Sequence, residues 1–226
     1  MTEMDLSSLV EGLERQTQPA PEPTQERSAS GTALVVSCMM ADCRHGPSLW
    51  PIDPSWDARA VQTLGAQTWT AHDGQRELDE TLTHLTATHD VHAVVVVGHT
   101  DCTVLGDAYE HAVVSTNAQS TAETHPESVV SLVEEAVSAG VVDQSLSDRQ
   151  ARARLVEYSI VRQVAFLTNS LPETVTVAGY VHDQTGVYGP FPDKLYLVSV
   201  DGVTDTDRLD GRLPDHEPVP VASLLD

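Results

Sequence analysis

Three side chains that bind zinc well stand at or just beyond the ends of two apolar segments of this 226-residue chain. The segment ALVVSC ends at Cys38, and the segment VVVVGH ends at His99, with Cys102 three residues later. Neighbouring parallel strands lie about 4.8 Å apart, so these side chains can converge on one ion at bond lengths of about 2.0–2.3 Å. Two sulfurs and one nitrogen leave a fourth tetrahedral position open, which is typical of catalytic zinc.

Two residues near these ligands leave alternatives open. Cys43 could supply a fourth ligand, and the site would then be a closed structural one of three cysteines and a histidine. Asp101 lies between His99 and Cys102 and either shapes the loop or orients the imidazole. The spacing H-x-x-C is a weak signal by itself and gains its weight from the two strands that precede the ligands.

The segments around the ligands predict an α/β fold with a largely parallel sheet. Apolar and β-branched runs predict strands at residues 32–38, 67–71, 92–97, 173–181 and 195–200. Apolar residues at helical spacing predict helices at residues 5–16, 75–88, 129–139 and 148–169. Strand, helix and strand in succession indicate a right-handed unit whose ligands bind beyond the carboxyl ends of the strands.

The composition is strongly acidic, and Lys194 is the only lysine. The chain has 12 basic and 34 acidic residues, which give a formal net charge of −22. This charge excludes nucleic acid and anionic membranes as partners, because both require a basic surface. An acid-rich, lysine-poor surface is typical of a salt-accumulating cytoplasm, where ions screen the repulsion.

The three cysteines are too few for a disulfide framework, and no apolar segment is long enough to span a bilayer. The N-terminus also lacks the features of a secretory signal, so we expect a cytoplasmic protein with reduced thiols. We divide the chain into an N-terminal helix and extended arm at residues 1–31, a zinc-binding α/β domain at 32–200, and a peripheral acidic tail at 201–226.

Residues 32–200 resemble the β-class carbonic anhydrases in consistent order. That family carries C-x-D-x-R at the end of its first strand and H-x-x-C at the end of its third. Here ADCR supplies Asp42 and Arg44, and GHTDC supplies His99 and Cys102. The segment VEYSIVRQVAFLTNSLPETVTVAGYVHDQTGVY is similar to the late helix of the family and the strand and turn that follow it.

The first motif departs from the family pattern, because two extra residues separate the cysteine from the arginine in CMMADCR. An ungapped match would place Met40 at the cysteine position, and a thioether is a poor ligand for zinc. We therefore assign Cys38, where the strand ends, as the first ligand.

The resemblance implies a fold with four mostly parallel strands, an antiparallel edge strand and flanking helices. It also implies hydration of carbon dioxide to bicarbonate by a zinc-bound hydroxide, in a homodimer or higher homo-oligomer. Asp42 would orient the hydroxide, and Arg44 would hold Asp42 in place. The composition suggests a halophilic, archaeal member. The alternatives are hydrolysis of carbon disulfide or carbonyl sulfide, and a non-catalytic protein that zinc stabilises.

Overall fold

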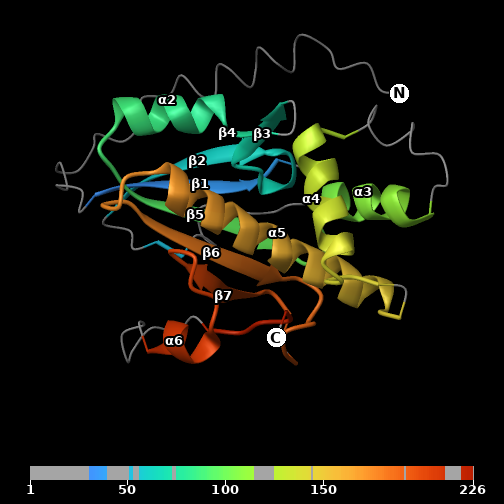
Figure 1. Ribbon diagram of the computed structural model, residues 1–226. Helices are drawn as coiled ribbons and strands as arrows, with labels where there is room; N and C mark the ends of the chain where they lie inside the picture. The colour runs from blue at the N-terminus through green and yellow to red at the C-terminus, as the bar shows by residue number, and fades with distance from the viewer. Residues whose placement is uncertain are drawn as a thin grey trace, which may run out of the picture.

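A five-stranded sheet in the order β2-β1-β5-β6-β7 forms the centre of the molecule (Figure 1). The computed structural model describes residues 31–39, 51–52, 56–72, 75–114, 125–143, 145–190, 192–211 and 220–225. The strands of the sheet are β1 (Thr32–Cys38), β2 (Asp57–Thr63), β5 (Val91–His99), β6 (Thr176–Asp183) and β7 (Lys194–Val200). The first four run parallel and β7 pairs antiparallel with β6, which confirms the predicted fold class.

The prediction that residues 67–71 form a strand of this sheet is wrong. Most of this segment belongs to β3 (Trp69–His72), which pairs with β4 (Gln75–Leu78) in a separate antiparallel hairpin. The place beside β1 is taken by β2, which is an edge strand and fully buries only Val61. A strand with so few buried positions has no apolar run, and hydrophobic patterning therefore misses it.

In Figure 1 the helices lie in front of the sheet and beyond its edges. They are α2 (Glu80–Thr88), α3 (Thr103–Val114), α4 (Glu127–Ser138), α5 (Asp148–Ser170) and α6 (Thr206–Asp210), with a short 3₁₀ turn, η2, at Leu64–Ala66. The structure confirms the helices predicted at 129–139 and 148–169. In the part of the chain that is described, no helix has the length and apolar character needed to cross a membrane.

The helix predicted at residues 75–88 is confirmed only in its second half. Its first residues form β4, and α2 begins after Asp79, whose carboxylate accepts hydrogen bonds from the backbone N–H groups of Thr81 and Leu82 at 2.9 and 3.4 Å. The helix predicted at residues 5–16 lies outside the described residues.

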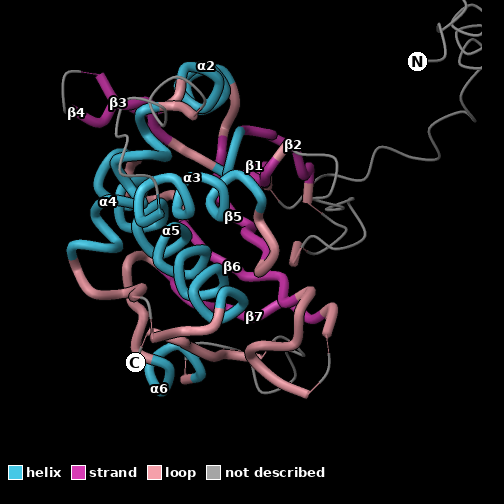
Figure 2. The backbone as a smooth tube through the Cα atoms, turned by 90° about the vertical axis from the view of Figure 1, so that its right-hand side faces the viewer, coloured by secondary structure: helices cyan, strands magenta, loops and turns pink. Residues whose placement is uncertain are grey.

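The long helix α5 packs directly on β5 and β6 (Figure 2). It can do so because two glycines of these strands face it. A Cβ atom at Gly98 would lie 2.8 Å from Val156 Cγ1, and one at Gly179 would lie 2.6 Å from Ile160 Cγ2. Real carbon atoms do not approach this closely, so both positions need a residue without a side chain. The absence of two side chains lets α5 lie close to the strand that ends in His99.

A buried carboxylate joins α5 to the end of the chain. Glu157 accepts hydrogen bonds from Tyr188 Oη at 2.6 Å, from Ser223 Oγ at 2.8 Å and from the backbone N–H of Leu224 at 2.8 Å. Its side chain is almost completely buried, and the hydrogen bonds offset the loss of hydration. Residues 220–225 are thereby held against α5.

Candidate metal centre

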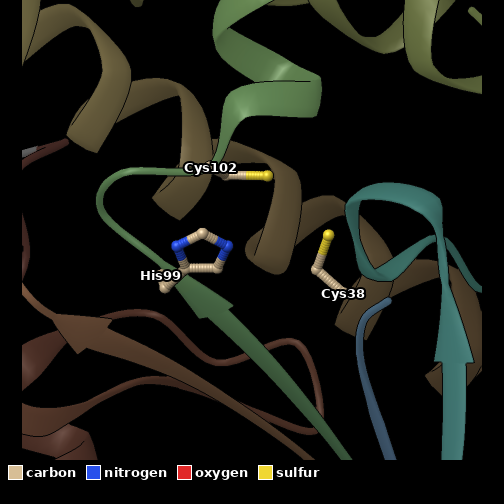
Figure 3. Close-up of side chains that lie close together, drawn as sticks. All are labelled: Cys38, His99 and Cys102. Carbon is tan, nitrogen blue, oxygen red and sulfur yellow. The ribbon is translucent and has the colours of Figure 1, made fainter. Parts of the chain in front are cut away.

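The three predicted ligands come together where β1 and β5 end. Cys38 is the last residue of β1, and His99 is the last residue of β5, which pairs with β1 in parallel. Cys102 stands immediately before α3. The two sulfurs and one imidazole nitrogen all lie within 4.8 Å of one another (Figure 3). Among the described residues, this is the single group of three such side chains that could hold a metal ion.

The donor set and its burial fit zinc. Cys38, His99 and Cys102 are only 1%, 1% and 3% exposed. Thiolate sulfur and imidazole nitrogen are the ligands that zinc prefers, and three protein ligands are the usual number for a zinc site with an open position. The two buried thiols and the imidazole could therefore bind one zinc ion from three sides.

The thiol of Cys102 is protonated in the protein without metal. A hydrogen bond with Cys38 and burial together raise the pKa of Cys102 far above its usual value. A metal ion binds the thiolate form, so zinc would displace this proton as it binds.

The imidazole of His99 has a side-chain amide beside its Nδ1 atom. Its Nδ1 atom lies 3.1 Å from Gln184 Oε1, within hydrogen-bond distance. Figure 3 shows the ring with one nitrogen directed toward the two sulfurs and the other directed away. Asp101, which the sequence offered as a partner for His99, is exposed, and Gln184 takes the position behind the ring instead.

Comparison with solved structures connects this geometry to one fold. The β-carbonic anhydrase CafA of Aspergillus fumigatus is 18% identical, with 92% of this chain and 95% of that chain covered and a TM-score of 0.54. The Coccomyxa β-carbonic anhydrase in complex with acetazolamide is 16% identical, with 94% of each chain covered and a TM-score of 0.54. The chain has the β-carbonic anhydrase fold.

Two comparisons of the sequence give no match. No family model matches the chain, and no curated protein matches it. A third structure, the β-carbonic anhydrase CafD of A. fumigatus, has a TM-score of 0.50 at 16% identity over 74% of this chain and 90% of that chain. At these identities, the likeness to the solved structures shows the fold.

The loop between the candidate ligands His99 and Cys102 is hydrogen-bonded to the end of β6 and the turn that follows it. The backbone N–H of Thr100 donates to the carbonyl of His182 at 3.0 Å. The hydroxyl of Thr100, in turn, lies 3.2 Å from the backbone N–H of Thr185 and 3.0 Å from its hydroxyl. All three contacts join residues more than 80 positions apart, so neither the sequence motif nor its spacing indicates them.

His182 lies beside the candidate ligands because β5 and β6 pair in register. The register places His182 opposite His99, and the His182 side chain is buried. Burial and the neighbouring His99 lower the pKa of His182, although the carboxylates of Asp193 and Asp183 act in the opposite direction. A neutral imidazole beside the centre adds no positive charge that would oppose a cation.

The residues predicted to act on the reacting oxygen fall outside the part of the chain that is described. These residues are Asp42 and Arg44. The undescribed segment also contains Met40, which an ungapped match would place at the cysteine position, and Cys43, the possible fourth ligand. Cys38 itself is described, and it is the cysteine that lies with His99 and Cys102. The roles of Asp42 and Arg44 stay predictions.

Proposed function

We propose that this protein is a zinc-dependent enzyme of the β-carbonic anhydrase family that hydrates carbon dioxide reversibly to bicarbonate. The observation that supports this most directly is the cluster of Cys38, His99 and Cys102, whose ligand atoms lie within 4.8 Å of one another at the carboxyl ends of parallel strands. The fold is that of β-carbonic anhydrases, and sites in parallel sheets form at this end of the strands.

Cys38, His99 and Cys102 would hold the ion. When bound, zinc supplies a Lewis acid that lowers the pKa of water and so provides a nucleophile near neutral pH. The chain itself contributes the charge balance: two thiolates neutralise the ion, while the imidazole, backed by the neutral amide of Gln184, adds none.

We assign Asp42 and Arg44 to orientation of the nucleophile. Asp42 accepts a hydrogen bond from the attacking oxygen, which directs a lone pair at the carbon of the substrate. Arg44 donates to the carboxylate of Asp42 and keeps it in that position, a task suited to the planar guanidinium. Carbon dioxide is uncharged, so it can approach this site despite the acidic surface of the protein.

We also propose that the protein is a cytoplasmic homo-oligomer. The site depends on two reduced thiols, which a reducing compartment maintains. The sheet face that points away from α5 carries a cavity of about 320 Å³, whose lining includes Ala33, Ile52, Trp56, Val95, Ala178 and Tyr180. An apolar lining of this kind suits a second copy of the chain, and the molar mass in solution tests that assignment.

Rapid-mixing kinetics of carbon dioxide hydration in molar potassium chloride test the proposed reaction. The zinc-loaded protein should catalyse hydration, and a chelated sample should lose the activity. Turnover of carbonyl sulfide or carbon disulfide without hydration of carbon dioxide would replace the proposed substrate. Zinc binding without any turnover would instead identify a zinc-stabilised protein.

A further inference from the structure

The side chain of Gln184 meets the candidate centre from the side away from the sulfurs. Its Oε1 atom lies 3.1 Å from Nδ1 of His99, across 85 positions of sequence. An amide oxygen only accepts hydrogen bonds, so this contact requires a proton on Nδ1. A neutral imidazole with its proton on Nδ1 carries its lone pair on Nε2, the other ring nitrogen.

We infer that Gln184 is a positioning residue that holds His99 in the tautomer and ring orientation needed to bind zinc through Nε2. The inference rests on the proposed zinc site, and it does not depend on which reaction that site catalyses. A ligating histidine generally needs a partner on its second nitrogen, and a neutral amide fills this role here.

Gln184 can do this because the turn that carries it is fixed on both sides. Asp183 is fully buried, and its carboxylate accepts the backbone N–H groups of Val187 at 3.0 Å and Tyr188 at 2.9 Å. On the other side, the backbone N–H of Thr185 donates to Thr100 Oγ1 at 3.2 Å. The backbone of Gln184 therefore has little freedom to move away from His99.

The amide also has an electrostatic consequence. A carboxylate at this position would draw the Nδ1 proton toward itself and make the imidazole a more basic ligand. The ion already receives two negative charges from Cys38 and Cys102, and a further anion would weaken its action on water. A neutral acceptor orients His99 without adding that charge.

The test compares the wild-type protein with Gln184→Met, Gln184→Glu and the control Gln75→Met, which makes the same exchange at an exposed position of β4. Long-range proton–nitrogen NMR of the metal-free proteins reports which nitrogen of His99 carries the proton. Competition with a chromogenic chelator gives the zinc dissociation constant. Neither measurement uses enzymatic activity, so failure of the proposed reaction leaves this test intact.

We expect the wild-type protein to show the Nδ1–H tautomer. Gln184→Met should bind zinc roughly 10- to 100-fold more weakly, whereas Gln184→Glu, which keeps an acceptor, should bind it at least as tightly as wild type. Gln75→Met should behave as wild type. An Nε2–H tautomer in the wild-type protein would overturn the inference, as would zinc affinity of Gln184→Met within about twofold of wild type. If Gln184→Met does not fold, weaker zinc binding by Gln184→Glu overturns it.

Discussion

At the scale of single residues, the candidate centre depends on donor type and on burial. The residues that carry the sulfur and imidazole donors are only 1–3% exposed, and the thiol of Cys102 stays protonated until a metal replaces its proton. An ion that prefers these donors therefore binds with release of protons, and its affinity rises with pH. Replacement of one donor residue should lower the zinc content more than it lowers the stability of the fold.

Replacement of single cysteines tests the assignment of Cys38 as the first ligand. Cys38→Ser should lose most of its zinc during dialysis, because a hydroxyl is a poor substitute for thiolate at this ion. Cys43→Ser is the matched control and should keep about one zinc per chain, as measured by atomic absorption. Retention of zinc by Cys38→Ser and its loss from Cys43→Ser would reverse the assignment.

Replacement of the orienting carboxylate tests the proposed reaction. Asp42→Asn should reduce kcat for hydration by about a hundredfold or more and leave zinc bound, because an amide cannot accept and align as a carboxylate does. Asp107→Asn, at an exposed position of α3, should retain full turnover. Equal rates for the two variants would remove Asp42 from the mechanism.

At the scale of elements, the centre depends on how closely α5 approaches the sheet. Gly98 and Gly179 lie under this helix, on the strands that end in His99 and in Asp183. The hairpin of β3 and β4 is joined to the helical layer by Glu135 of α4, which binds Arg76 and Arg162 at 2.6 Å each. The close packing of α5 on β5 and β6 positions the strands that lead to His99 and Gln184.

A methyl group at Gly179 should force α5 away from β6. Its Cβ would lie 2.6 Å from Ile160 Cγ2 and 2.8 Å from Val164 Cγ2, so Gly179→Ala should lower the free energy of unfolding by about 1–3 kcal/mol. Urea denaturation measures the change. Gly211→Ala is a suitable control, because Gly211 has a φ of −67° and a Cβ there meets its nearest atom at 3.4 Å. Unchanged stability of Gly179→Ala would contradict the close packing.

The two arginines that contact Glu135 should make the free energy of unfolding depend on pH in the acid range. Burial disfavours ionisation of Glu135, but the hydrogen bond from Arg76 and the charge of Arg162 outweigh it and lower its pKa. A lowered pKa stabilises the fold above the pKa of the unfolded chain, about 4.3, and this contribution disappears as pH falls through the lower folded value. Glu135→Gln should therefore cost about 1 kcal/mol at neutral pH and progressively less in acid.

Urea titrations at several pH values check this expectation, with Glu134→Gln on the exposed side of α4 as the control. A stability difference between wild type and Glu135→Gln that stays constant from neutral pH into the acid range would show that Glu135 is not stabilised as an anion.

At the scale of the whole molecule, charge dominates the behaviour expected in solution. A formal net charge of −22 on 226 residues places many carboxylates close to one another on the surface. Repulsion among them opposes the compact state, and dissolved ions reduce it over distances of about 10 Å at 0.1 M salt. The protein should therefore be most stable where salt is abundant.

The melting temperature should rise from dilute buffer to molar potassium chloride, because screening weakens repulsion in the folded state. Differential scanning fluorimetry measures the shift, and sucrose at the same osmolality separates screening from solute exclusion. An equal rise in sucrose, or a melting temperature that salt leaves unchanged, would contradict a role for charge repulsion.

Much of the fold and the cluster of candidate ligands could be predicted from the order of residues. Strands β1, β5, β6 and β7 carry apolar runs, and α5 carries apolar residues at helical spacing, so short-range patterns are sufficient to identify them. The ligands stand at or near the ends of two such runs, and parallel pairing brings those ends together.

Other features depended on contacts that no local pattern records. β2 is an edge strand whose residues are mostly polar, so only its pairing with β1 identifies it as a strand of the main sheet. The hydrogen bond of Gln184 with His99 and that of Thr185 with Thr100 each join residues 85 positions apart. Hydrophobic periodicity indicates which residues are buried, whereas the register of β5 against β6 determines which polar residues meet. The local pattern thus defined the donors, and the folded chain decided which groups hold them in place.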